Sequence, residues 1–181
     1  VKLWLEHLKY QYEKDGLMPR DKYGDWCVPP EKPEMIHSQD PSRITDGTLI
    51  GTAYYYKLNK LMEKFAGLQG LAVDAAQFAA EAGKVKDAFN KRFLTVKPNT
   101  TAVPGHLLYP DSTYYGNNTV TANLLPIVFG MTPDEYTKQE ASKNIIRNIL
   151  TLNGEHISCG VIGVQWLMQG LTDMGRGDIA W

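Results

Sequence analysis

The sequence has only two cysteines, Cys27 and Cys159, which lie far apart and have no His or Cys neighbours at metal-ligand spacing. It therefore gives no indication of a disulfide framework or a zinc site. It also lacks an excess of either charge, because 19 Lys and Arg stand against 20 Asp and Glu. Without a basic stripe, no nucleic-acid partner is expected. No apolar run approaches the roughly 18 residues of a membrane helix, so no membrane partner is expected either.

Motifs for cofactors and metals are missing as well. The sequence has no phosphate-binding glycine loop and no nucleophile elbow. Its four histidines are too scattered to form a metal site. We therefore expect no cofactor and no metal. What remains, with 43% hydrophobic and 22% charged residues over 181 positions, is typical of one globular domain with a real core.

Helical periodicity dominates the chain, and no segment gives a confident strand signal. Helices are predicted over residues 1–14, 48–66, 72–93, 119–131, 133–150 and 161–175. Asp46 or Thr48 is the expected cap of the second helix, and Thr132 with Pro133 is expected to begin the fifth. Pro126 is expected to kink the fourth helix. The fold class is therefore all-α.

Two long loops, 17–47 and 94–118, are rich in proline and glycine and show neither helical nor strand periodicity. The connections 67–70 and 130–132 are tight, and each predicts an antiparallel helical hairpin. Stacked hairpins without a sequence repeat favour a closed toroid over a solenoid. In such a toroid the long loops would share one face and build the site. Trp4 and the run Tyr54 to Tyr56 are expected in the core.

The stretch KYGDWCVPPE, residues 22–31, places a carboxylate and an indole side by side within the first long loop. An indole can cover the apolar face of a sugar ring, and a carboxylate can accept hydrogen bonds from its hydroxyls. Trp26 and Asp25 are therefore candidate carbohydrate-binding residues. The alternatives are a loop anchor for Trp26 and, for Asp25, a turn carboxylate that binds nearby backbone amides.

Several blocks occur in order along the whole chain: YGDW, TLIGTAYYYKLNKLMEKFAGLQG, DAAQFAAEAGKVKDAFNKRF, GNNTVTANLLPIVFGMTPDE and GEHISCGVIGVQWLMQGLTDMGRGDIAW. Together they resemble the α-L-rhamnosidases of glycoside hydrolase family 78, in the style found in gut Bacteroides. The resemblance implies an (α/α)6 toroid that removes terminal α-L-rhamnose with inversion of configuration. It also implies a bacterial parent protein that is periplasmic or secreted.

In that family the general acid lies upstream of these blocks and the general base lies downstream. The resemblance therefore implies that residues 1–181 form a partial catalytic domain without its N-terminal and C-terminal portions, and that no catalytic residue lies in this chain. Since inversion needs two carboxyl groups on opposite sides of the sugar, the isolated chain is expected to be inactive. The partner that the resemblance implies is a rhamnose-containing carbohydrate.

By the same resemblance Trp26 packs against rhamnose at the position of cleavage, and Asp25 binds hydroxyls or orients the loop. His156 reaches the substrate face, although this chain has HISCG where many members carry threonines. The alternative for His156 is a residue that bonds loop backbone and fixes the turn. Tyr114, Tyr115, Asn117 and Asn118 form a polar aromatic cluster that either contacts sugar or caps the following helix.

Two other interpretations stay open. One is a non-catalytic helical toroid or solenoid module that binds a carbohydrate or a protein, and the other is a toroid hydrolase with different sugar specificity. A partial toroid must also expose apolar helix faces, so self-association of the chain is expected.

Overall fold

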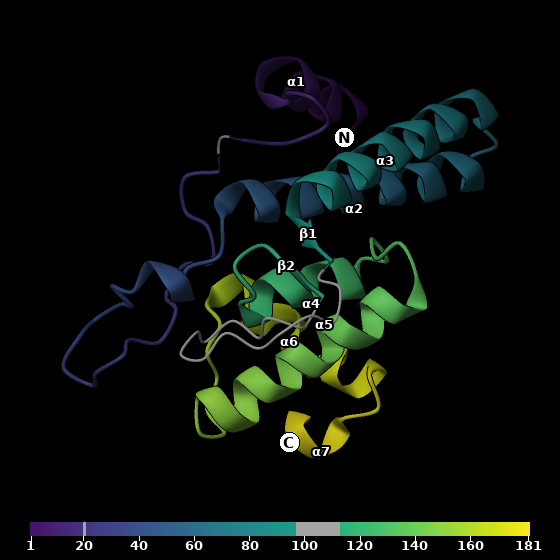
Figure 1. Ribbon diagram of the computed structural model, residues 1–181. Coiled ribbons are helices and arrows are strands. Elements are labelled where there is room, and N and C mark those ends of the chain that lie inside the picture. The colour runs from purple at the N-terminus through teal and green to yellow at the C-terminus, as the bar shows by residue number, and fades with distance from the viewer. Residues whose placement is uncertain (20, 97–112) are drawn as a thin grey trace.

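The computed structural model describes residues 1–19, 21–96 and 113–181, and these residues are mostly helical (Figure 1). The helices are α1 (Lys2–Tyr12), α2 (Gly47–Leu68), α3 (Ala72–Phe93), α4 (Val120–Val128), α5 (Glu135–Arg147), α6 (Val161–Asp173) and α7 (Gly177–Ala180). A 3-10 turn spans Pro41–Arg43 and a π-helical turn spans Asn148–Leu152. The six predicted helices are confirmed, and α7 is a short addition.

One small β-ladder departs from the all-helical expectation. Strands β1 (Leu94–Thr95) and β2 (Tyr114–Tyr115) pair antiparallel, with Leu94 opposite Tyr115. The pair is too short to produce a period-2 pattern in the sequence, which is why periodicity did not reveal it. It joins the end of α3 to the turn that leads into α4.

The helix boundaries follow from local capping. The Asp46 carboxylate accepts from the Thr48 amide at 2.8 Å, so the expectation of an Asp46 cap is confirmed. The expected start of the fifth helix at Thr132 is wrong, because Asp134 accepts from the Thr137 amide at 2.7 Å and the helix begins at Glu135. Its regular part also ends earlier than predicted, at Arg147, where the π-helical turn follows.

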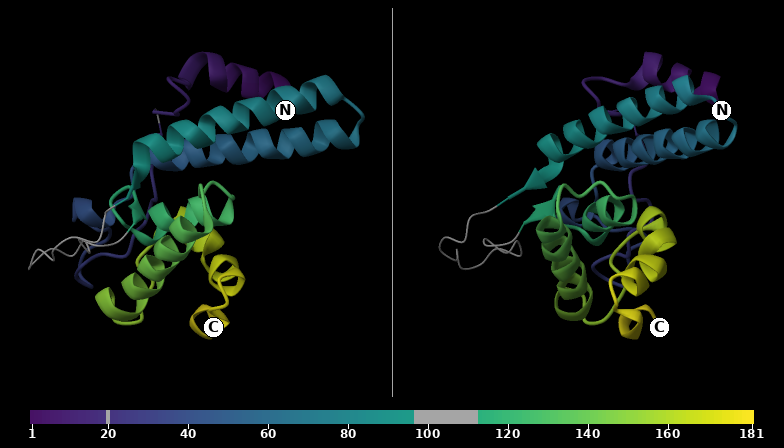
Figure 2. Two further views of the ribbon diagram at one scale, coloured as in Figure 1. Left: turned by 45° about the vertical axis from the view of Figure 1, so that its right-hand side comes forward. Right: turned by 90° about the vertical axis from the view of Figure 1, so that its right-hand side faces the viewer.

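The helices form two packed groups. Figure 2 shows the antiparallel pair α2 and α3 as one layer, with α1 along one side and α4 to α6 along the other. α4 is the central helix: Leu125 packs with the α2 and α3 core, whereas Leu124 packs with α5 and α6. Every α4 residue from Val120 to Pro126 is buried, and the two polar ones, Thr121 and Asn123, are hydrogen-bonded to Asp25 and to the Tyr115 amide. The helix continues through Pro126 to Val128.

The core predicted from the sequence was partly wrong. Trp4 is 59% exposed, and the buried residue of α1 is its neighbour Leu5. Salt bridges from Lys2 to Asp74 and from Lys9 to Glu81 fasten α1 to α3, so the orientation of α1 does not follow its aromatic residues. Tyr55 and Tyr56 are buried as predicted.

Candidate functional site

The N-terminal ends of α2, α4 and α6 meet on one side of the molecule. The Thr45 hydroxyl, just before α2, lies 2.6 Å from the hydroxyl of Thr119, which caps α4. Asp25 links Thr121 of α4 to Gly160 at the start of α6. The described residues that directly precede these three helices therefore converge here. The short connections 69–71 and 129–134 lie at the other ends of the helices.

Asp25 is buried and closes the N-terminus of α6. Its carboxylate accepts from the amides of Gly160 at 2.8 Å, Ile162 at 3.0 Å and Gly163 at 3.0 Å. The Thr121 hydroxyl donates a further short hydrogen bond. These amides are donors that a helix leaves unpaired at its N-terminus, and the positive end of the helix dipole favours a carboxylate there. With 3% of its surface exposed, Asp25 has the contacts of a residue that orients the loop.

The backbone next to Asp25 completes this cap. The amide of Val161 donates to the carbonyl oxygen of Trp26 at 2.7 Å. A Cβ at Gly160 would clash with the backbone of Asp25 and Trp26, and one at Gly163 would clash with the Thr121 hydroxyl. Both glycines therefore allow the loop to approach the helix closely. The close approach at Gly160 could not be predicted from the sequence, because nothing local in HISCGVIG shows its remote partner.

Trp26 points outward from this fixed backbone. Its side chain is 60% exposed, and its nearest aromatic neighbour is His37, at 6.4 Å between ring centroids with the planes tilted by 44°. Cys27 follows in the left-handed region with φ of 61°, which turns the chain sharply after the indole. The loop thus buries the carboxylate and presents the adjacent indole to solvent.

His156 belongs to the loop that leads into α6. Its Nδ1 lies 3.1 Å from the carbonyl oxygen of Asn153 and 2.6 Å from that of Gly154. Because two acceptors face Nδ1, this nitrogen carries the proton, and in the neutral ring Nε2 is an acceptor. The side chain is exposed. It is thus anchored to loop backbone on one edge and open on the other, and it makes no ring contact with Trp26.

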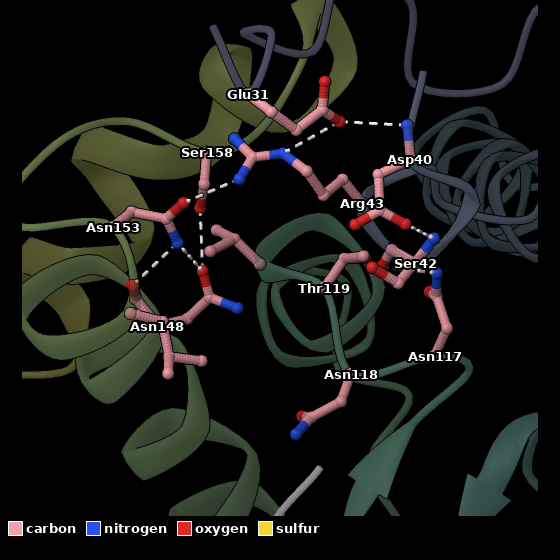
Figure 3. A pocket seen from close by; sticks show the side chains of 12 residues that line it. Glu31, Asp40, Ser42, Arg43, Asn117, Asn118, Thr119, Asn148, Asn153 and Ser158 are labelled. Atoms are coloured by element: carbon pink, nitrogen blue, oxygen red, sulfur yellow. Dashed lines mark hydrogen bonds and ion pairs between the residues drawn. The ribbon is translucent and has the colours of Figure 1, made fainter. Parts of the chain in front are cut away.

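A pocket of about 240 Å³ lies between the loop that carries Trp26 (residues 21–46, the Trp26 loop) and the loop that carries His156 (residues 153–160, the His156 loop). Figure 3 shows Arg43 crossing it from Glu31 to Asn153. The guanidinium donates to Asn153 Oδ1 at 3.2 Å and to the Pro29 carbonyl oxygen at 3.1 Å, and its Nε lies 3.8 Å from Glu31. Arg43 therefore ties the two loops together. This residue could not be predicted from the sequence, since an isolated arginine between Ser42 and Ile44 forms no motif.

Glu31 is held in its charged form. The Ser38 hydroxyl donates to it, as do the amides of Asp40 at 2.9 Å and Gln39 at 3.3 Å. These donors, led by the Ser38 hydroxyl, lower the pKa of Glu31 to about 2. The carboxylate is therefore ionised at any physiological pH.

The polar aromatic cluster is mainly structural. Tyr114 and Tyr115 are buried, and Tyr115 donates from its amide to Asn123 Oδ1 at 3.0 Å. The cap of α4 is Thr119, the residue after the cluster, so the capping alternative is wrong about which residue caps the helix; Asn118 instead accepts from Asn123 Nδ2 of α4 at 2.8 Å. Asn117 and Asn118 nevertheless line the pocket, so the amide side chains of this cluster reach the candidate site.

Other chemistry is not found among the described residues. No group of three His, Cys, Asp or Glu side chains in the described ranges is arranged to hold a metal ion. Cys27 is exposed and Cys159 is buried, and both are free thiols. Of the helices in the described part of the chain, none has the length and apolarity needed to cross a membrane.

Comparisons with known proteins agree with the resemblance noted above. Residues 1–181 match the family model described as bacterial alpha-L-rhamnosidase 6 hairpin glycosidase domain. An alpha-L-rhamnosidase of Formosa agariphila is 30% identical over 93% of the chain, and one of Streptomyces avermitilis is 26% identical over all of it. The chain covers only 16% and 14% of those two proteins.

Solved structures give the same fold. The alpha-L-rhamnosidase of Dictyoglumus thermophilum matches with a TM-score of 0.77 and 27% identity, over 99% of this chain and 18% of that one. The Streptomyces avermitilis enzyme, solved in complex with L-rhamnose, matches with a TM-score of 0.74 and 23% identity, over 99% of this chain and 14% of that one. The predicted fold class, all-α with helical hairpins that form part of a toroid, is thereby confirmed.

Proposed function

Because the chain belongs to the bacterial alpha-L-rhamnosidase six-hairpin glycosidase family, we propose that it is part of an inverting glycoside hydrolase that releases terminal α-L-rhamnose. The observation that carries this proposal most directly is Trp26, an exposed indole on backbone that the α6 cap holds in place. Such an indole is suited to cover the apolar face and the methyl group of rhamnose.

His156 and Asp25 support this platform in different ways. The open edge of the His156 ring can accept a hydrogen bond from a sugar hydroxyl, while Nδ1 keeps the ring fixed. Asp25 does not contact the sugar but positions Trp26. Its four hydrogen bonds hold Asp25 against α6, and the Trp26 backbone, which follows directly, is held with it. We therefore assign sugar contact to Trp26 and His156, and positioning to Asp25.

Catalysis needs two carboxyl groups, and neither Glu31 nor Asp25 is suited to either role. An inverting hydrolase pairs a general acid whose pKa is raised with a carboxylate base across the sugar. Glu31 has the opposite property, since its pKa is about 2, and Asp25 is fully occupied by amide and hydroxyl donors. We infer that both catalytic carboxyl groups come from other parts of the parent polypeptide, so that this chain alone is inactive.

The test compares two tryptophans in the complete protein. Trp26→Ala should lower kcat/KM on 4-nitrophenyl α-L-rhamnoside at least tenfold, because loss of a stacking surface costs more than about 1.4 kcal/mol. Trp4→Ala is the matched control, since Trp4 is 59% exposed on α1, and it should leave kcat/KM unchanged. NMR should show β-L-rhamnose as the first product. Equal activity of the two variants, or release of the α-anomer, would refute the proposal.

Two outcomes would favour other functions. Sugar binding without hydrolysis by the complete protein would support a non-catalytic carbohydrate module. Hydrolysis of another glycoside in place of the rhamnoside would support a toroid hydrolase of different specificity.

We also infer that the isolated chain self-associates. α6 exposes Val161, Val164 and Met168, and a second cavity of about 500 Å³ beside it is lined by Leu167, Met168 and Ile179 among others. Apolar surface of this kind favours association with a second copy. Sedimentation velocity should show dimers or larger species at micromolar concentration, which Met168→Lys should reduce. A sharp monomer peak for the unmodified chain would contradict the inference.

A further inference from the structure

The pocket beside Arg43 contains polar atoms that lack a hydrogen-bond partner within the described chain. Asn117 Nδ2 donates to the carbonyl oxygens of Ser42 at 3.1 Å and Ile44 at 2.8 Å, which fixes the orientation of the amide. Asn117 Oδ1 is buried and accepts no hydrogen bond from the described residues. Arg43 Nε is also buried, and it faces the Glu31 carboxylate at 3.8 Å, which is an ion-pair distance beyond hydrogen-bond range. Buried polar atoms are almost always satisfied, so this pattern indicates a missing polar occupant.

The opposite wall offers a donor. Asn148 Oδ1 accepts from Asn153 Nδ2 at 2.7 Å and from the Ser158 hydroxyl at 2.8 Å. These two donors fix the Asn148 amide, and Figure 3 shows its nitrogen turned away from both of them, toward the space below Arg43. The π-helical turn that begins at Asn148 is therefore a positioning element, as such turns often are.

The charges in the pocket select its ligand. Glu31 and Asp40 would repel an anion, and the Arg43 guanidinium would repel a cation. A hydroxyl group both donates and accepts, so it can satisfy amide oxygens and amide nitrogens together. Val120 and Leu152 add apolar wall. This combination suits a neutral sugar ring, with apolar C–H faces and a rim of hydroxyls.

We propose that this pocket is a second carbohydrate subsite, which binds the sugar unit attached to the terminal rhamnose. The inference rests on the proposed rhamnosidase function. Neither Trp26 nor His156 lines the pocket, although each lies on a loop that forms one of its walls. A rhamnosyl unit on the Trp26 indole thus leaves the pocket free for its neighbour. Arg43 hydrogen-bonds to both walls and so fixes their positions relative to each other.

Two variants of the complete protein test this subsite. Ser42→Trp fills the pocket, and it keeps the backbone amide and carbonyl oxygen through which Ser42 bonds to Asp40 and Asn117. Asn148→Asp keeps the oxygen that accepts from Asn153 and Ser158 and replaces the amide donor by a carboxylate oxygen. Gln77→Glu, on the exposed surface of α3, is the matched control for the added charge.

Each variant is assayed on an α-L-rhamnosyl-glucose disaccharide and on 4-nitrophenyl α-L-rhamnoside, which has no second sugar. We expect kcat/KM on the disaccharide to fall about tenfold in both pocket variants, as loss of one or two neutral hydrogen bonds predicts. The aryl rhamnoside should be cleaved at the wild-type rate, and Gln77→Glu should behave as wild type on both substrates. Equal melting temperatures establish that the variants are folded.

The results separate this inference from the proposed function. If the unmodified protein cleaves neither substrate, the rhamnosidase proposal fails. If it cleaves both and the pocket variants keep full activity on the disaccharide, the second subsite is refuted. Equal losses on both substrates in folded variants would also overturn it, because the pocket would then hold the rhamnosyl unit itself.

Discussion

Replacing Asp25 by alanine removes the one side chain that pairs the first amides of α6. Three N–H groups, those of Gly160 and Gly163, which are buried, and that of Ile162, which is part-buried, would lose their acceptor together with the Thr121 hydroxyl. Each unsatisfied buried donor costs about 1–3 kcal/mol, and partial access of water to the helix end reduces the sum. We expect the free energy of unfolding to fall by about 3–5 kcal/mol, the lower part of the range that the unpaired donors would cost if all were fully desolvated.

The control is Asp46→Ala, which removes another aspartate N-cap. Asp46 caps α2 from an exposed position and accepts one amide hydrogen bond, from Thr48. Its loss should cost about 1 kcal/mol, the usual value for a helix cap. Urea denaturation followed by circular dichroism gives both values under one set of conditions. If the two variants lose the same stability, Asp25 is an ordinary cap and the reasoning is wrong.

Two further predictions concern titratable groups. Because the folded pKa of Glu31 is about 2, against an ordinary 4.5, its contribution to stability is present above pH 4.5 and is lost as the pH falls through 2. The gap in melting temperature between wild type and Glu31→Gln should therefore narrow from pH 5 to pH 2, and a constant gap would contradict this. Burial, with a smaller contribution from Asp25, raises the pKa of Cys159 to about 12, whereas Cys27 is exposed. A thiol reagent should therefore modify Cys27 rapidly in the folded chain, and Cys159 only after denaturation. Rapid modification of both cysteines in the folded chain would contradict the burial of Cys159.

The helices could be predicted because their signals are local. The alanine-rich run of α3 and the cap at Asp46 each lie within a few residues of the helix that they specify. The tight connection 69–71 likewise dictates the antiparallel pairing of α2 with α3. The face that each helix buries was less predictable. Trp4 fits the apolar stripe of α1, yet it is exposed, because ion pairs with α3 and the burial of Leu5 orient that helix.

The candidate site was only half visible in the sequence, because its partners are far apart along the chain. YGDW drew attention to Trp26 and Asp25, but the amides that Asp25 binds lie more than a hundred residues later. The pocket is assembled from residues of three separate loops, and none of Arg43, Asn117 or Asn148 stands in a recognisable motif.

The contacts of Asp25 with α6 explain why a buried carboxylate directly precedes the exposed indole of Trp26 in the sequence. A sugar platform must be exposed to bind and rigid to bind well, since ordering a loop on binding costs free energy. A single exposed tryptophan on a long loop satisfies only the first requirement. By burying the preceding carboxylate against α6, and by pairing the Trp26 carbonyl oxygen with Val161, the chain satisfies the second without covering the indole. The same hydrogen bonds hold the Trp26 loop beside Gly160, where the His156 loop ends. One buried carboxylate therefore fixes the positions of the two loops that form opposite walls of the pocket.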